Sequence, residues 1–159
     1  MLQVQSHSLR AFGFLAILGL VVSMFCTTLY AKKAATSKIE YSEFFAYETP
    51  SGANISMVGG ILTNPTKKAI TLKSANAPIA QVELHDTTNA QGHMEMHHIP
   101  EIAIKANDKV VLQSGGLHIM LINLESPLKA GDTLELTLHF SDGDLLLQVP
   151  VIKKEVSAK

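Results

Sequence analysis

The sequence predicts an all-β domain, an antiparallel β-sandwich preceded by an N-terminal apolar leader helix. Three observations support this prediction. Short apolar runs recur between turn residues, two of these runs carry a clear hairpin signal, and no amphipathic helical stretch of any length follows the leader. Many short strands at such spacing are typical of a sandwich or a barrel. With 159 residues, 47% hydrophobic and 17% charged, the chain fits one globular domain with a short appendage.

The leader occupies residues 1–31. Arg10 is the only arginine, and residues 11–31 after it carry no charge. A positive start followed by an apolar run is typical of a secretory signal peptide or an N-terminal anchor. This run could also span a bilayer, which needs about 20 apolar residues. Cleavage near Ala31 is favoured over retention in the inner membrane, and either alternative places the rest of the chain in the periplasm.

Cysteine and charge limit the chemistry of the exported part. Cys26 is the only cysteine, and it lies in the leader, where the bulky Phe25 before it disfavours lipid attachment. The exported part therefore has no thiol, and any soft-metal site must use thioether and imidazole donors. The chain has 13 lysines and arginines against 14 acidic residues, so it lacks the basic footprint of a nucleic-acid partner.

A β-sandwich domain is predicted over residues 39–152, after a flexible lead-in at 32–38 and before a short tail at 153–159. Its first strands are apolar runs bounded by turn residues. They comprise residues 55–62, closed by Asn64-Pro65-Thr66, and residues 69–72, 79–84, 94–98, 102–104 and 110–112. A Gly115-Gly116 turn then leads into the strand at 117–124.

The last two predicted strands form the clearest hairpin. Residues 133–140 alternate apolar and polar side chains, with Leu134, Leu136, Leu138 and Phe140 on one face. Their partner is the run at 145–152. Between them, Ser141-Asp142-Gly143-Asp144 contains an Asp-Gly dipeptide, which flanked by alternating apolar residues is a strong hairpin signal.

Methionine and histidine are concentrated between residues 85 and 120. This stretch contains His85, His93, Met94, Met96, His97, His98, His118 and Met120, whereas residues 32–159 otherwise contain only Met57 and His139. Alternate residues of a strand share a face. His118 and Met120 should therefore project together, away from the core that Ile119 faces.

The same rule extends the candidate site to two further segments. Met94, Met96 and His98 share a face if their segment is extended. His85 follows Leu84, which faces the core, so His85 should point outward. Lone methionines are usually core residues and lone histidines surface ones. Met57, His93, His97 and His139 are accordingly expected to lie outside the site, and Met94 and His98 are auxiliary candidates.

The donor types indicate the metal. Thioether sulfur is soft and suits Cu(I), and imidazole binds many metals. Zinc sites are built from Cys, His and carboxylates, and Ca²⁺ and Mg²⁺ need clustered oxygens, which this segment lacks. Neutral thioethers hold Cu(I) less tightly than thiolates, which suits a carrier that must release its metal.

At these residues the sequence resembles the periplasmic copper chaperone family called PCuAC. The family motif is a histidine, ten residues, a methionine, twenty-one residues, then His-x-Met. His85, Met96, His118 and Met120 match all of these spacings. The surroundings also resemble the family over about residues 39–152, including the Gly115-Gly116 turn before His118 and the segment 127–132 after Met120.

The resemblance implies a cupredoxin-like, immunoglobulin-like β-sandwich that binds one Cu(I) through His85, Met96, His118 and Met120. It implies delivery to an acceptor such as the Cu(A) site in subunit II of cytochrome c oxidase, or to another periplasmic copper carrier. A monomer is expected, touching the membrane only through an uncleaved leader. Many relatives carry a methionine just after the first histidine, where this chain has Asp86-Thr87. The tail at 153–159 lacks the donors of a second copper site found in some relatives.

Other functions fit the residues less well. Blue-copper electron transfer needs a cysteine thiolate, which the exported part lacks. No Ser-His-Asp or paired-carboxylate signature indicates an enzyme. A metal-free structural or adhesive β-sandwich remains the alternative, and it predicts no copper uptake.

Overall fold

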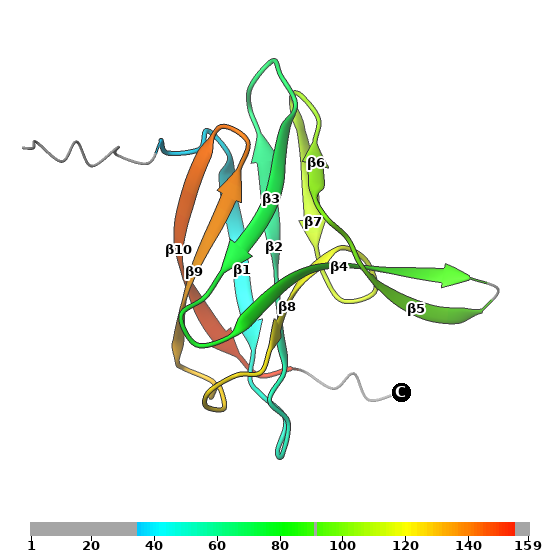
Figure 1. Ribbon diagram of the computed structural model, residues 1–159, viewed down its shortest axis with the longest axis vertical. Coiled ribbons are helices and arrows are strands. Elements are labelled where there is room, and N and C mark those ends of the chain that lie inside the picture. Colours follow the sequence, from blue (N-terminus) through cyan, green and yellow to red (C-terminus); the bar gives the residue numbers. More distant parts are fainter. Residues whose placement is uncertain (1–34, 91, 155–159) are drawn as a thin grey trace, which may run out of the picture. The chain divides into compact units, whose positions relative to one another are not determined.

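Ten β-strands make up the part of the chain that the computed structural model describes, residues 35–90 and 92–154 (Figure 1). They are β1 (Glu40–Tyr47), β2 (Ser56–Asn64), β3 (Ile70–Asn76), β4 (Gln81–Ala90), β5 (His93–His98), β6 (Ile102–Ile104), β7 (Asp108–Leu112), β8 (His118–Ile122), β9 (Thr133–Phe140) and β10 (Gly143–Ile152). The predicted leader lies outside the described residues. Within them, no helix is long and apolar enough to cross a membrane.

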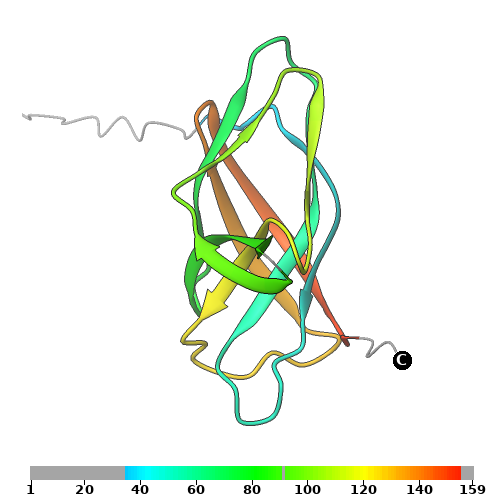
Figure 2. The same cartoon turned by 90° about the vertical axis from the view of Figure 1, so that its right-hand side faces the viewer.

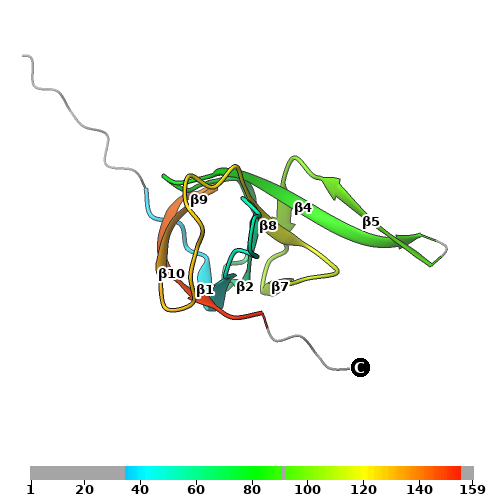
Figure 3. The same cartoon turned by 90° about the horizontal axis from the view of Figure 1, so that it is seen from below.

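The strands form two layers, as the sequence predicts. One layer has the order β5-β4-β8-β2-β1 with β7 also on β2, and the other has the order β10-β9-β3-β6. Figure 3 shows β9 and β10 facing β2, β7 and β8 across the domain. The layers join where β1 pairs with β10, and this pair is parallel, with Ala46 opposite Val151. The other strand pairs are antiparallel, so the predicted antiparallel β-sandwich is confirmed, with this one parallel pair joining its layers.

Alternating aliphatic side chains fill the space between the layers. The predicted row on β9 is buried, with Leu136 and Leu138 fully inaccessible to solvent. On β8, Ile119 and Leu121 are also fully buried. The buried apolar residues are Leu, Ile, Val, Ala and Phe, and no described methionine is among them. The core is thus built without thioethers.

Strand β1 has no counterpart among the predicted strands because its alternation is broken. Its register against β2 shifts between Ser42 and Phe45, and Glu43 has a positive φ of 55°. This bulge lets Phe44 and Phe45 both press against β2, which carries glycines opposite them. A Cβ at Gly59 would lie 2.6 Å from the Phe45 ring, so only glycine fits there.

The predicted Asp-Gly hairpin joins β9 and β10, with Gly143 pairing with Phe140. Strand β10 therefore begins two residues before the predicted start. The hairpin also holds the segment before β1: Ser37 Oγ donates to Asp142 Oδ1 at 2.7 Å, and Asp144 N donates to Ala35 O at 2.7 Å. A Cβ at Gly143 would collide with the Ala35 carbonyl, so glycine permits this close contact.

Strand β2 divides the first layer. Along one edge, Ser56–Val58 pair with β8, and Gly60–Asn64 pair with β7. Strand β8 joins β2 to β4, and the β4–β5 hairpin projects from the sandwich as an arm (Figure 1) that points toward the viewer in Figure 2. Strand β4 continues beyond its predicted end at residue 84 because the polar residues after His85 pair with β5. Every residue of β5 is exposed.

Candidate metal-binding cleft

Three histidines form a row across the outer face of β5, β4 and β8. His85 pairs with His118 in the β4–β8 ladder and with His98 in the β4–β5 ladder. Each neighbouring ring centroid lies 5.9 Å from that of His85. Directly paired residues project from the same face of a sheet. The face opposite the core thus carries three imidazoles side by side.

Methionines flank this row on the same face. Met120 pairs with Glu83 on β4 and with Met57 on β2. Thr87, two residues after His85, pairs with Met96 on β5, and Asn89 pairs with Met94. Met57 and Met120 alternate with buried residues, and all of β5 is exposed, so none of these methionines takes a core position.

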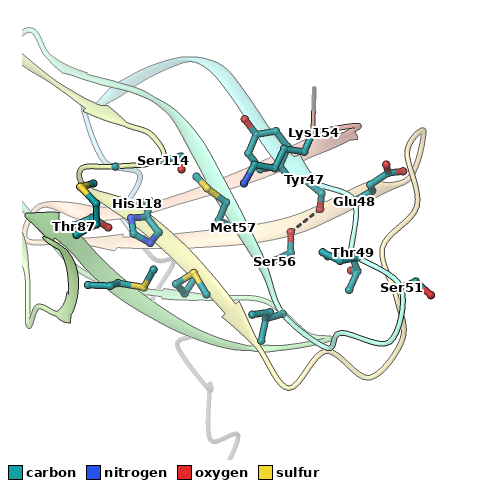
Figure 4. A pocket seen from close by; sticks show the side chains of 16 residues that line it. Tyr47, Glu48, Thr49, Ser51, Ser56, Met57, Thr87, Ser114, His118 and Lys154 are labelled. Carbon is teal, nitrogen blue, oxygen red and sulfur yellow. Dashed lines mark hydrogen bonds between the residues drawn. The ribbon is translucent and has the colours of Figure 1, made fainter. Parts of the chain in front are cut away.

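A cleft of about 700 Å³ collects the sulfur donors (Figure 4). It is lined by all four methionines of the described residues, Met57, Met94, Met96 and Met120, together with His118. Tyr47, Glu48, Thr49, Pro50, Ser51, Ile55, Ser56, Thr87, Ser114, Gly115 and Lys154 complete the wall. Met94 and Met96 are more than half exposed, so an incoming ion can reach the sulfurs from solvent.

The main chain fixes the ring of His118. Its Nδ1 lies 2.8 Å from the carbonyl oxygen of Gly116, which also accepts from Thr87 N at 3.1 Å. A carbonyl only accepts, so Nδ1 carries the proton and Nε2 keeps its lone pair. The residue is buried, with 2% of its surface exposed. The Gly115-Gly116 turn thus orients the imidazole through Nδ1 and leaves Nε2 as the nitrogen that could bind a metal.

A side chain fixes the ring of His85. Its Nε2 donates to Glu83 Oε2 at 2.9 Å, and Gln81 donates to the other carboxylate oxygen at 2.9 Å. The hydrogen bond from His85 is the main cause that lowers the pKa of Glu83, so the carboxylate stays ionised at neutral pH. The other ring nitrogen, Nδ1, is buried and has no hydrogen-bond partner among the described residues.

An unpartnered buried nitrogen is costly unless something binds it. A metal ion fits this position, because ligating histidines commonly donate their second nitrogen to a carboxylate or a backbone carbonyl. His85 is hydrogen-bonded to a carboxylate and His118 to a backbone carbonyl. Within residues 35–90 and 92–154, no three histidine, cysteine or acidic side chains gather so as to hold a metal by themselves. A metal on this face would need the thioethers, and thioethers select a soft ion such as Cu(I).

The structure brings most of the predicted residues together. Met96, His118, Met120 and the auxiliary Met94 line the cleft. His85 lies directly beside His118, whereas the auxiliary His98 lies on the other side of His85, on exposed β5. The histidines expected to lie outside the site are elsewhere. His97 lies on the opposite face of β5, 3.5 Å from Glu95, and His139 is hydrogen-bonded to Asp144 in the β9–β10 hairpin.

Met57 is predicted from the sequence to lie outside the site, but in the structure it lines the cleft. Its local pattern offers one signal, since Ser56 and Val58 on either side are buried and Met57 must face outward. The pairing of Met57 with Met120 joins positions far apart in the chain. Spacing within one segment does not reveal such a pair.

The fold is that of PCuAC domains. The copper-bound PCuAC domain from PmoF2 superposes with a TM-score of 0.64 over 76% of this chain and 97% of that domain, at 17% identity. The Cu(I) form of DR1885 from Deinococcus radiodurans is 31% identical, with a TM-score of 0.58 over 72% of this chain and 79% of that one. Apo-DR1885 is 27% identical over 97% of both chains, with a TM-score of 0.55.

The chain belongs to the LpqE-like family, described as "Putative lipoprotein LpqE-like", whose model matches residues 39–151. A protein of Leifsonia xyli subsp. xyli, described as "Putative lipoprotein Lxx21020", is 33% identical over 86 residues, or 54% of this chain. This match spans 52% of that relative, so the chain corresponds to about half the length of the curated relative it matches.

Proposed function

We propose that this protein is an exported copper chaperone that holds one Cu(I) with His85, Met96, His118 and Met120 and delivers it to an acceptor protein. The observation that carries the proposal is that hydrogen bonds orient both histidine rings and leave one nitrogen of each ring free to bind a metal. Each ring has one nitrogen engaged by a fixed acceptor, and the buried Nδ1 of His85 has no partner among the described residues. Four methionines line the cleft together with His118, and the ring of His85 lies beside that of His118.

The donor set also suits a carrier rather than a storage or catalytic centre. Two imidazoles and two thioethers are neutral, so the bound ion keeps its positive charge and leaves more readily than from thiolates. Four donors leave no open position for a substrate. Similarity to the Cu(I) form of DR1885 at 31% identity supports copper as the cargo.

The family and its Leifsonia relative are both described as lipoproteins, which supports an exported, membrane-associated protein. The proposed compartment is the periplasm, and the first candidate acceptor is the Cu(A) site of cytochrome c oxidase. Intact mass of the membrane-extracted protein would distinguish cleavage near Ala31, a retained leader and a lipid on Cys26. Oxidase activity in a deletion strain, with and without added copper, would test the acceptor.

Anaerobic competition between the protein and a Cu(I) chelator tests the central proposal. We expect one tightly bound Cu(I) per chain and much weaker binding of Zn(II), because zinc favours thiolate, imidazole and carboxylate ligands. Zinc binding as tight as copper binding would contradict the assignment. No uptake of either metal would favour the metal-free structural or adhesive β-sandwich.

A further inference from the structure

Met57 is a fifth soft or borderline donor beside the four residues of the proposed site. It pairs directly with Met120 across β2 and β8 and lines the same cleft. Directly paired residues of an antiparallel pair have Cβ atoms about 4.5–5.5 Å apart. Methionine adds three rotatable bonds to this short separation. The sulfurs of Met57 and Met120 can therefore reach one ion.

Packing does not require a methionine at this position. The inward neighbours Ser56 and Val58 are buried, whereas Met57 is half-buried on the outer face. The core uses aliphatic and aromatic residues and contains no described methionine. The thioether of Met57 thus lies where the other described thioethers lie, on the wall of the cleft.

Met57 lies on the strand next to the proposed site, on the side away from β5. In the order β5-β4-β8-β2-β1, the four proposed ligands lie on β5, β4 and β8, and Met57 lies next, on β2. Beyond it the cleft is walled by Tyr47, Glu48 and Lys154, which offer no soft donor. Figure 4 shows Met57 between His118 and Tyr47.

We infer that Met57 is the exchange ligand of the cleft, a thioether that binds Cu(I) transiently as it enters or leaves the four-residue site. This inference rests on the proposed function. In the step, a bond forms between Cu(I) and the Met57 sulfur, and one bond from Cu(I) to a ligand on β4 or β5 breaks. The metal remains Cu(I), every donor is neutral, and no proton or electron is transferred.

The test separates rate from affinity in the full-length chain carrying one Cu(I). Wild type, Met57→Leu, Met120→Leu and Ile55→Leu are each mixed anaerobically with excess bathocuproine disulfonate in a stopped-flow instrument. Equilibrium affinities are measured by competition with the same chelator. Ile55→Leu is the matched control because it changes another side chain of the cleft wall without removing a sulfur.

We expect Met57→Leu to slow transfer to the chelator by about tenfold and to change the equilibrium affinity much less than Met120→Leu does. Faster transfer with an affinity loss like that of Met120→Leu would make Met57 a resident ligand and overturn the inference. So would a transfer rate like that of Ile55→Leu, which would make Met57 a wall residue only. Failure of the wild type to take up Cu(I) would instead overturn the proposed function, and the inference with it.

Discussion

His85 and His118 are direct partners across β4 and β8, with ring centroids 5.9 Å apart and ring planes inclined at 48°. They present different nitrogens, Nδ1 of His85 and Nε2 of His118, because their other nitrogens are held differently. A backbone carbonyl holds His118, and mutation cannot remove it. The ring of His85 is held by a side chain, the carboxylate of Glu83. A single substitution can therefore release the ring of His85 but not that of His118.

Replacing Glu83 should therefore weaken copper binding although Glu83 is not a proposed ligand. We expect Glu83→Ala to lower Cu(I) affinity about 10–100-fold, the usual range for removing a group that orients a ligand. Glu83→Gln keeps an oxygen that can accept from His85 and should lose less. Glu95→Ala is the control, because Glu95 lies on the other face of β5 beside His97. Chelator competition measures all three, and wild-type affinity in Glu83→Ala would show that His85 needs no such support.

Glu83 also predicts a feature of the acid stability of the metal-free protein. Its pKa is lowered in the fold from an ordinary value of 4.5. Its contribution to stability is therefore fully present above that value and is lost as the pH falls through the lowered pKa. Urea unfolding of Glu83→Gln should show a smaller loss of stability over this acid range than the wild type does. Equal pH dependence in the two proteins would contradict the assigned cause.

The two methionines of the proposed site should matter for metal and little for folding. Leucine conserves their volume closely, so we expect Met96→Leu with Met120→Leu to abolish Cu(I) binding and change apo stability by less than about 1.5 kcal/mol. Ile119, the inward neighbour of Met120, is fully buried. Ile119→Ala should instead cost about 2–5 kcal/mol. Urea denaturation with chelator competition checks both, and an unfolded double variant would show that these methionines are packing elements.

Copper affinity should decline in mild acid without vanishing. Imidazole binds a metal only when neutral, and histidine side chains ordinarily titrate near about 6.5. Protons should compete with the metal for imidazole as the solution is acidified from neutral pH to about pH 5, whereas thioether sulfur does not titrate. Replacing both histidines with alanine should weaken binding and flatten this dependence. A constant wild-type affinity over the range would remove the histidines from the proposed ligand set.

Local alternation predicted the architecture well. The buried row on β9 and the outward pair His118 and Met120 on β8 both follow from the two-residue period of a strand. Strand β1 was missed because a bulge interrupts that period. The extension of β4 was missed because its end is polar and is held by pairing with β5.

Relationships between distant strands were beyond the local pattern. The parallel pairing of β1 with β10 and the pairing of Met57 with Met120 depend on sheet order, which spacing along one strand does not encode. The hydrogen bond from His85 to Glu83 joins residues two apart, and its donor and acceptor were both visible in the sequence. Their geometry depends on rotamers that the sequence leaves free.

Because the described thioethers lie outside the core, oxidation should affect metal binding and folding differently. Peroxide converts methionine to its sulfoxide, which replaces a soft sulfur donor with a polar group. Met94 and Met96 are more than half exposed, whereas the described core contains no methionine to oxidise. Oxidation would thus abolish copper binding by the cleft while the sandwich stays folded. Reduction of the sulfoxide would then restore copper binding without refolding.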